Sequence, residues 1–398
     1  MTRLLRLLRH IWSIDACRAA LLLFFILDIA FFPCIWGNKT FLASARDAAS
    51  IMPYGAWEGQ HRTPRFPKTL DEGVPGYLTE PWFKLIGKQY LAEKNPPLWN
   101  PYQDFGTPLA ANMESQPFYP LTALLSLHLT PRTYNWYILL RLFLAGFCMY
   151  LFLRFFVSFV PALAGGVASM LAGYYILFIT MQQTSVEVML PAALLTGEWL
   201  LRKANYVSAV LFAAVLFLVM VGGMPESAFI LLLFVYGYLI ARCVFDAELR
   251  PKWLRIVTHL AISTVTGLLL SAILLLPFYE YLHLSFNLHQ PGNIAGAVPG
   301  LGYENLDSSV IGYVFPLLFG PTPNDAFSGI HNYFGIVALF LAAVSVTAIA
   351  RGRTKDAQLN FLTIFSGLSI VVVLLKRYGF TPVNAIGDLP LFRFISFT

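Results

Sequence analysis

The sequence has few charged residues and lacks the short motifs that are typical of soluble enzymes. Only 12% of its 398 residues are charged and 57% are hydrophobic, whereas a soluble domain has about 25% charged residues. The four cysteines include no CxxC pair and the seven histidines show no ligand spacing, which argues against a disulfide framework or a thiolate or histidine metal site. There is no P-loop, GxSxG or HExxH motif and no basic aromatic patch for nucleic acid. Nothing in the sequence indicates a soluble catalytic domain.

Apolar runs of about 20 residues recur instead, which is the length that crosses a bilayer as a helix. They predict an all-α polytopic membrane protein with about nine transmembrane helices. The expected spans are 17–36, 134–156, 159–180, 185–201, 206–222, 226–244, 256–278, 332–350 and 359–376.

The basic residues favour a cytoplasmic N-terminus. With this orientation the inner segments hold 14 Lys and Arg against five acids, and every short inner loop is basic. The first apolar stretch follows Arg3, Arg6 and Arg9 but contains Asp28 and lacks a small-residue cleavage site. We therefore interpret it as an uncleaved first helix rather than a signal peptide.

Five regions follow from this count. Residues 1–37 form the cytoplasmic N-terminus and first helix, and 38–133 form a long extracytoplasmic loop. Helices 2–7 occupy 134–278, a second outer loop occupies 279–331, and helices 8–9 with an outer C-terminal segment occupy 332–398. Loops of this length are expected to hold short helices and a site. The apolar segment 118–129 is too short to span and is expected to form a re-entrant or interfacial helix.

Polar residues that could carry chemistry lie mainly on the outer side. Asp47 follows the first span closely, where a carboxylate suits a general base acting on an acceptor hydroxyl, although a solvated or capping Asp is equally ordinary. The segments 97–102 and 112–120 are dense in amides, prolines and aromatics, a mixture that suits sugar binding or an interfacial aromatic belt. Their candidate residues are Trp99, Asn100, Tyr102, Asn112, Glu114, Gln116 and Tyr119.

Further carboxylates mark the outer helix ends. Glu187, Glu226 and Glu280 stand at one predicted level, and with Asp47 and Glu114 they could converge on an acceptor or a metal. Each could equally cap a helix or lie in headgroup water.

Two ionisable residues fall inside predicted spans. Arg141 suits a phosphate contact because its fork stays charged, or a structural pair with Asp28. Asp28 itself is expected to face the helix bundle.

In these segments the sequence resembles the YfhO family of bacterial membrane proteins, within the GT-C class of glycosyltransferases. The resemblance rests on Arg46-Asp47 and on the blocks 97–102, 106–110 and 116–120. Later matches are the Gly223-x-Pro225 turn, Leu276-Pro277-x-x-Glu280, and 389–394 with Arg393. Family members continue beyond the last block, so the resemblance implies that this chain is either a fragment or a truncated member.

The resemblance implies a GT-C-like fold in the bacterial cytoplasmic membrane. It implies an inverting enzyme that moves a sugar from a polyprenyl-phosphate donor to an envelope glycan or lipid acceptor at the outer face. Asp47 would be the base, Arg141 and Arg393 would contact phosphate, and Arg46, Glu226 and Glu280 would line the substrate site. Oxygen ligands from Asp47, Glu114 and Glu226 could hold a divalent Mg or Mn.

Two other functions fit the same pattern. A transporter or flippase of a lipid-linked saccharide would show inverted repeats and broken helices, and the sequence shows neither clearly. A non-catalytic membrane scaffold would need none of the candidate acids.

Overall fold

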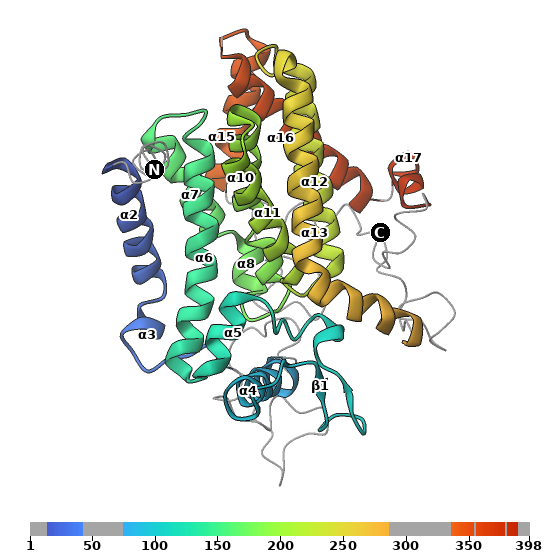
Figure 1. Ribbon diagram of the computed structural model, residues 1–398. Coiled ribbons are helices and arrows are strands. Elements are labelled where there is room, and N and C mark those ends of the chain that lie inside the picture. Colours follow the sequence, from blue (N-terminus) through green and yellow to red (C-terminus); the bar gives the residue numbers. More distant parts are fainter. Residues whose placement is uncertain (1–13, 43–74, 286–335, 354–355, 379, 389–398) are drawn as a thin grey trace. The chain divides into compact units, whose positions relative to one another are not determined.

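The computed structural model describes residues 14–42, 75–285, 336–353, 356–378 and 380–388, which are mostly helical (Figure 1). The only β-ladder in these ranges is an antiparallel pair, β1 (Trp99–Asn100) with β2 (Thr107–Pro108). The chain is therefore all-α in class, and its long apolar helices are of the membrane-spanning kind.

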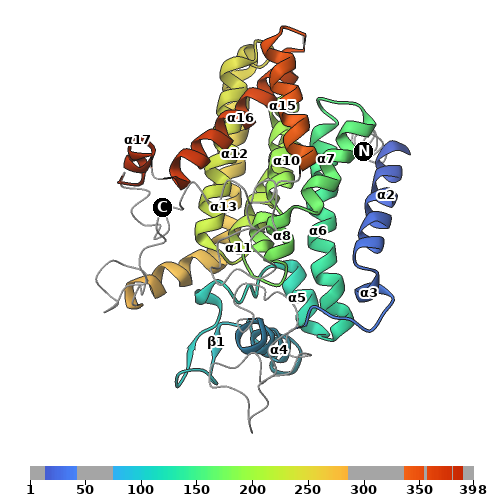
Figure 2. The same ribbon diagram turned by 180° about the vertical axis from the view of Figure 1, so that it is seen from behind.

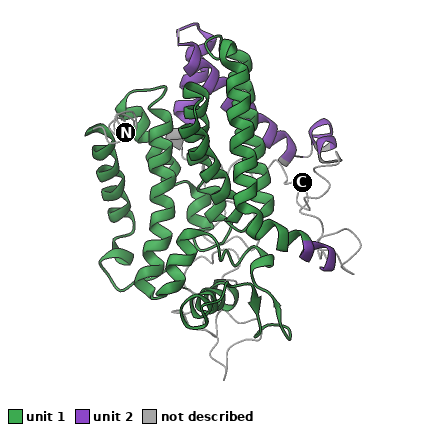
Figure 3. Ribbon diagram, in the orientation of Figure 1, with its two compact units in different colours: residues 1–279 green, residues 280–398 purple. Residues whose placement is uncertain are grey.

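The chain forms two compact units, Met1–Tyr279 and Glu280–Thr398, coloured separately in Figure 3. In the first unit the helices are α2 (Ile14–Ala30), α3 (Phe32–Ile35), α4 (Glu80–Lys88), α5 (Pro120–Leu127), α6 (Pro131–Leu153), α7 (Phe159–Met170), α8 (Gly173–Leu177), α9 (Thr184–Glu187), α10 (Leu190–Lys203), α11 (Tyr206–Val221), α12 (Pro225–Phe245) and most of α13 (Trp253–Leu284). The second unit holds the end of α13 and α15 (Ile336–Ala350), α16 (Ala357–Arg377) and α17 (Thr381–Asn384).

Five helical segments within the described ranges are long and apolar enough to cross a membrane. They are Pro131–Leu153, Phe159–Leu177, Pro225–Phe245, Arg250–Leu284 and Ala357–Lys376. Two more, Tyr206–Val221 and Leu339–Ala350, are apolar but shorter. The predicted count of nine spans stays a prediction, because α2 and α10, at 17 and 14 residues, are also short.

The third and fourth expected spans are interrupted. The predicted helix 159–180 ends at Met170 and resumes at Gly173, because the backbone of Ala172 leaves the helical region with ψ 133°. The predicted span 185–201 becomes the short α9 followed by α10, which begins at Leu190 with Pro191 in its first turn. Proline is well placed there since the first-turn N–H has no intrahelical acceptor.

Helix starts follow ordinary capping chemistry. Thr130 and Thr133 form a capping box at the start of α6, in which the Thr133 N–H donates to Thr130 Oγ1 at 3.2 Å. Asn205 and Ser208 do the same for α11, with a distance of 2.9 Å. Each box satisfies backbone donors that a helix N-terminus leaves open.

The core of the first unit joins α2, α6 and α7, which lie side by side in both views (Figures 1 and 2). The buried residues of α2 are Ala16, Ala19, Leu23 and Leu27, which share one face at helical spacing. A Cβ on Gly166 would lie 2.8 Å from the Gly146 carbonyl oxygen, so these two glycines let α6 and α7 approach closely. Such small-residue contacts are the usual means of packing helices in lipid.

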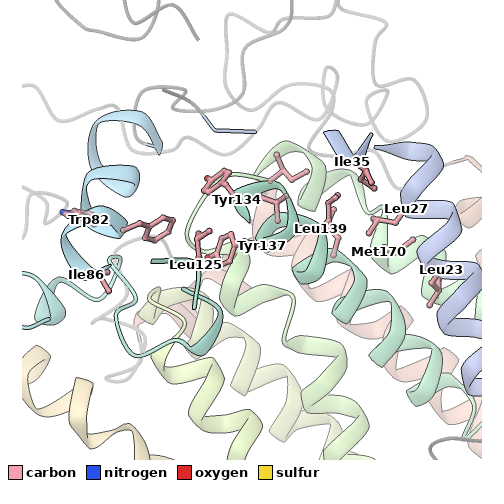
Figure 4. Packing of buried hydrophobic residues seen from close by; sticks show 14 of the residues in the cluster. Leu23, Leu27, Ile35, Trp82, Ile86, Leu125, Tyr134, Tyr137, Leu139 and Met170 are labelled. Atoms are coloured by element: carbon pink, nitrogen blue, oxygen red, sulfur yellow. The ribbon is translucent and has the colours of Figure 1, made fainter. Parts of the chain in front are cut away.

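The same cluster extends to the first outer loop. Phe83 of α4 packs against Tyr134 and Tyr137 of α6, with ring centres 6.5 and 6.0 Å apart. Trp82 and Ile86 of α4 and Leu125 of α5 belong to the same cluster (Figure 4). A Cβ on Gly87 would overlap the Ser126 carbonyl oxygen, so α4 and α5 are in close contact at this point. The described part of the segment between α3 and α6 is therefore packed onto the N-terminal end of α6.

Asp28 does not have the environment expected of it. It lies beside the buried stripe of α2 and is partly exposed, and its carboxylate accepts a hydrogen bond from the Trp36 indole N–H at 2.6 Å. The partner is local, one short loop away, rather than Arg141.

Asn135 fixes the chain as it leaves α3. Its amide nitrogen donates to the carbonyl oxygens of Cys34 and Lys39 at 2.8 and 2.9 Å. Its amide oxygen accepts from Thr40 Oγ1 and from the Phe41 N–H at 2.9 and 3.0 Å. All four hydrogen-bonding positions of this buried amide are thus used to hold segment 34–41 against α6.

Candidate functional site

The β1–β2 hairpin presents two of the predicted aromatic residues to solvent or ligand. The Trp99 and Tyr102 side chains are 51% and 73% exposed. Asn100 between them is buried, where its Oδ1 accepts from the Tyr102 N–H at 3.0 Å and shapes the turn. The rings are accessible for stacking, whereas Asn100 supports the loop.

The hairpin is tied to α4 and its continuation. Gln89 Nε2 donates to the Trp99 carbonyl oxygen at 2.7 Å, and Lys88 Nζ donates to the Tyr102 hydroxyl at 2.8 Å. Gly106, with φ 112°, closes the hairpin, and a Cβ on it would lie 2.8 Å from the Trp99 ring. The orientation of both rings is therefore set by contacts within the loop.

Segment 113–119 turns beneath the hairpin and carries Glu114 and Gln116. Asn112 Oδ1 accepts from the Ser115 N–H at 3.0 Å, and Ser115 Oγ donates to the Leu109 carbonyl oxygen at 2.6 Å. Met113 and Gln116 both adopt left-handed backbone conformations, with φ 61° and 54°. Such conformations cost non-glycine residues about 1–2 kcal/mol and persist only where surrounding contacts hold them.

Gln116 lies at the centre of a buried polar network. Its Nε2 donates to the Gln182 carbonyl oxygen at 2.8 Å, and its Oε1 accepts from Thr122 Oγ1 at 3.2 Å. The Tyr137 hydroxyl lies within hydrogen-bonding distance of the Gln116 oxygen and of Ser185 Oγ, at 3.5 and 3.2 Å. The network connects the first outer loop, α5, α6 and the α8–α9 connection.

Arg141 forms the inner boundary of this network. It is only 1% exposed, and its Nη2 donates to the Ile179 carbonyl oxygen at 2.8 Å while Nη1 donates to Ser185 Oγ at 3.0 Å. Its guanidinium also lies 4.5 Å from the Tyr137 ring centre. In the part of the chain that the structure describes, its Nε has no partner. Both terminal nitrogens are therefore used to hold the α8–α9 connection.

Glu187 lies at the end of α9, in the same connection. Its Oε1 accepts hydrogen bonds from the Tyr174 hydroxyl and Ser227 Oγ, both at 2.9 Å. Its Oε2 is buried without a partner among the described residues. Glu187 thereby joins α8 to the first turn of α12.

Glu114 and Glu226 are electrostatically coupled. Burial raises the pKa of the Glu114 carboxyl above its ordinary range, and the negative charge of Glu226 raises it further. Glu226 stands in the first turn of α12, where the helix dipole favours a negative charge. A carboxyl with a raised pKa close to a second carboxyl is an arrangement that acid–base chemistry uses.

A divalent metal was one expected occupant of these acids. Carboxylate oxygens suit Mg or Mn, but the described residues contain no group of three or more Asp, Glu, His or Cys that could hold a metal. Asp47, the third predicted ligand, lies outside the described residues.

The remaining predicted residues are divided by location. Arg46, Asp47 and Arg393 lie outside the described residues. Glu280 is exposed near the end of α13, in the second unit. Tyr119 is buried at the start of α5, and burial raises the pKa of its hydroxyl.

Sequence reasoning missed several members of the network, namely Thr122, Tyr137, Gln182 and Ser185. The available signal was the polar run Gln182-Gln183-Thr184-Ser185, which interrupts an otherwise apolar stretch. The expected spans 159–180 and 185–201 place this run at their junction.

Comparison with known proteins adds no family assignment. No protein-family model, curated protein or solved structure matches the chain.

Proposed function

We propose that this protein is a membrane glycosyltransferase of the GT-C type, similar to the YfhO family. In this proposal it moves a sugar from a polyprenyl-phosphate donor to an envelope glycan or lipid acceptor on the outer face of the bacterial cytoplasmic membrane. The observation that carries the proposal is the coupling of Glu114, on the first outer loop, to Glu226, at the outer end of α12. Glu114 belongs to the same loop as the exposed Trp99 and Tyr102 rings.

The chemistry follows from the requirements of glycosyl transfer. A carboxylate takes the proton of the acceptor hydroxyl while that oxygen bonds to the anomeric carbon, and the bond from this carbon to the lipid phosphate breaks with inversion. Asp47 is the proposed base, from the family resemblance. Trp99 and Tyr102 would cover the apolar face of a sugar ring, and Arg46 and Arg393 would face the departing phosphate.

Arg141 has a different part in this proposal from the one its sequence position predicts. Its terminal nitrogens already donate to Ile179 and Ser185, and it is 1% exposed. In this proposal Arg141 supports the phosphate site indirectly, by holding the α8–α9 connection. Other cations make the contact with the phosphate.

The test is sugar transfer from a radiolabelled polyprenyl-phosphate donor pool in membranes at matched expression. We expect transfer by the wild type, loss in Asp47→Asn and Glu226→Gln, and retention in Glu93→Gln. Glu93 is a suitable control because it pairs with Lys88 at 3.2 Å on the surface of the same loop. Transfer unchanged in Asp47→Asn would remove Asp47 as the base, and no transfer by the wild type would contradict the proposal for these donors.

A lipid-linked saccharide transporter is the second candidate, and one observation favours it. The helix Phe159–Leu177 is interrupted after Met170, and the ionisable Arg141 and Glu187 lie beside the following connection. Broken helices with ionisable groups are typical of transport sites. In a transporter, Glu187→Gln would abolish lipid movement between leaflets and Asp47→Asn would leave it intact.

A further inference from the structure

Gln116 was expected to contact a substrate, but its place in the structure gives it another task. Its side chain is 0% exposed, so its amide cannot reach a ligand on the loop surface. Both ends of the amide are engaged, by the Gln182 carbonyl oxygen on one side and by Thr122 Oγ1 on the other. A buried amide with both ends satisfied is costly to disturb, since removing it leaves its partners unpaired.

The Gly222-Gly223 turn between α11 and α12 packs directly on Gln116. A Cβ on Gly223 would overlap Gln116 Cγ and lie 2.7 Å from the Met113 carbonyl oxygen. Gly223 also has φ 94°, a backbone conformation that side chains other than glycine rarely adopt. Two features therefore require glycine here, the close approach and the backbone angle.

This contact joins the two segments that carry the acids. Glu114 lies between Met113 and Gln116, and Glu226 follows Gly223 at the first turn of α12. We propose that Gln116 and Gly223 are positioning residues that lock the Met113–Gln116 turn onto the α11–α12 turn and so hold Glu114 beside Glu226. The inference deepens the proposed function and rests on it for its catalytic meaning, but the lock itself is a property of the fold.

Among the residues that the structure describes, one charged group is found to act on Glu114. Its burial and the Glu226 carboxylate determine its protonation, and Glu226 is the charged side chain that the structure couples to it. Arg141 acts on Tyr119 of the same turn rather than on Glu114. Loss of the Glu226 effect on the Glu114 pKa would therefore indicate that the two turns no longer hold these carboxyls together.

The experiment is an infrared titration of the Glu114 carboxyl in purified full-length protein, with the band assigned by its loss in Glu114→Gln. In an otherwise wild-type protein, we expect Glu226→Gln to lower the pKa of Glu114, because a neighbouring negative charge is removed. In Gln116→Met, which keeps the side-chain length but loses the amide, we expect Glu226→Gln to have little further effect. Gly223→Ala should remove the coupling in the same way.

Matched controls separate this lock from general disturbance. Gly237→Ala makes the same substitution on α12 where a Cβ would meet nothing within 4 Å. Ser126→Ala removes a buried hydroxyl that bonds only to the Thr122 carbonyl oxygen one turn earlier, at 2.7 Å, so no second segment is released. In both control variants, Glu226→Gln should still lower the pKa of Glu114 by the full amount.

The decisive measurement is the change in the Glu114 pKa that Glu226→Gln causes. If Glu226→Gln shifts the pKa of Glu114 as strongly in the folded Gln116→Met protein as in the wild type, the inference is wrong. Should Gly223→Ala fail to fold, Gln116→Met still decides the question. Sugar transfer is a second readout, expected to fall about 100-fold in kcat in Gln116→Met with little change in donor KM, as for a misplacement of about 1 Å. The titration does not depend on sugar transfer. Its result can therefore be interpreted even if the glycosyltransferase proposal fails.

Discussion

The Glu198 carboxylate accepts hydrogen bonds from Arg242 Nη2 at 2.9 Å and from Arg242 Nε at 3.2 Å, although both side chains are almost entirely buried. Arg202 Nε and the Tyr238 hydroxyl add bonds to the same carboxylate, each at 2.7 Å. Arg242 Nη1 extends the cluster to Asp246 at 2.7 Å. Two acids and two arginines balance, so α10 and α12 are joined by a neutral set of charges.

Removing one member of this cluster should be costly. Glu198→Gln leaves two arginines facing each other without their common acceptor, and breaking a buried pair in this way costs about 3–5 kcal/mol. We expect a marked drop in the thermal unfolding midpoint in detergent. Glu93→Gln, which breaks the exposed pair with Lys88, should change it little. Equal midpoints for the two variants would show that the cluster does not stabilise the bundle.

Asn135 should control how firmly the start of the first loop is held. Asn135→Ala removes four hydrogen bonds to segment 34–41 and leaves two carbonyl oxygens without a donor. Each such loss costs about 1–3 kcal/mol when the group stays buried. Trypsin should therefore cleave after Lys39 at least about tenfold faster, since about 1.4 kcal/mol of local opening gives that factor.

The control for this cleavage is Leu140→Ala, on an exposed position of the same helix. It should leave the cleavage rate unchanged. An unchanged rate in Asn135→Ala as well would mean that other contacts hold the segment.

The Glu114 carboxyl should make stability depend on pH. Its pKa is raised above the ordinary 4.5, so the folded state keeps a proton that the unfolded state releases. Its stabilising contribution is complete below pH 4.5 and is lost as pH rises through the folded-state pKa. Glu114→Gln should therefore show a smaller fall in unfolding midpoint above pH 4.5 than the wild type.

Two comparisons check that assignment. Glu226→Gln should reduce the fall in part, because it lowers the Glu114 pKa, while Glu93→Gln should retain it in full. A midpoint that falls equally with pH in Glu114→Gln and in the wild type would assign the dependence to another group.

The exposed rings of the hairpin should affect substrate binding rather than the chemical step. If Trp99 and Tyr102 cover a sugar face, Trp99→Ala and Tyr102→Ala should raise the acceptor KM about tenfold at similar kcat, as expected for the loss of one ring contact worth about 1.4 kcal/mol. Leu91→Ala, at another exposed apolar position of the loop, is the matched control. A rise in KM of the same size in the control would indicate a general effect of apolar surface.

Some of these features could be predicted from the sequence and others could not. Composition and run length predicted long apolar helices because a bilayer-spanning segment must satisfy its own backbone and present an apolar surface. The positions of α6, α12 and α16 were predicted to within a few residues for this reason. The interruption between α7 and α8 was not, since the residues around Ala172 remain apolar on both sides of the break.

The site shows the same division. The sequence indicated that Trp99, Tyr102, Glu114 and Gln116 belong to one polar, aromatic loop, but gave no means of separating exposed residues from buried ones. The structure exposes Trp99 and Tyr102 and buries Gln116 completely. Residues of this one loop thus have opposite tasks, two at the surface and one in the interior.

By itself the sequence determined the helical class and the long apolar helices that suit a membrane, because these depend on the number and kind of residues in each segment. Only the tertiary structure decided which polar groups meet. The contact of Gln116 with Gly223, the coupling of Glu114 to Glu226 and the enclosure of Arg141 each join segments far apart in the chain. Contacts of this kind depend on how helices and loops pack in space, which local pattern does not encode.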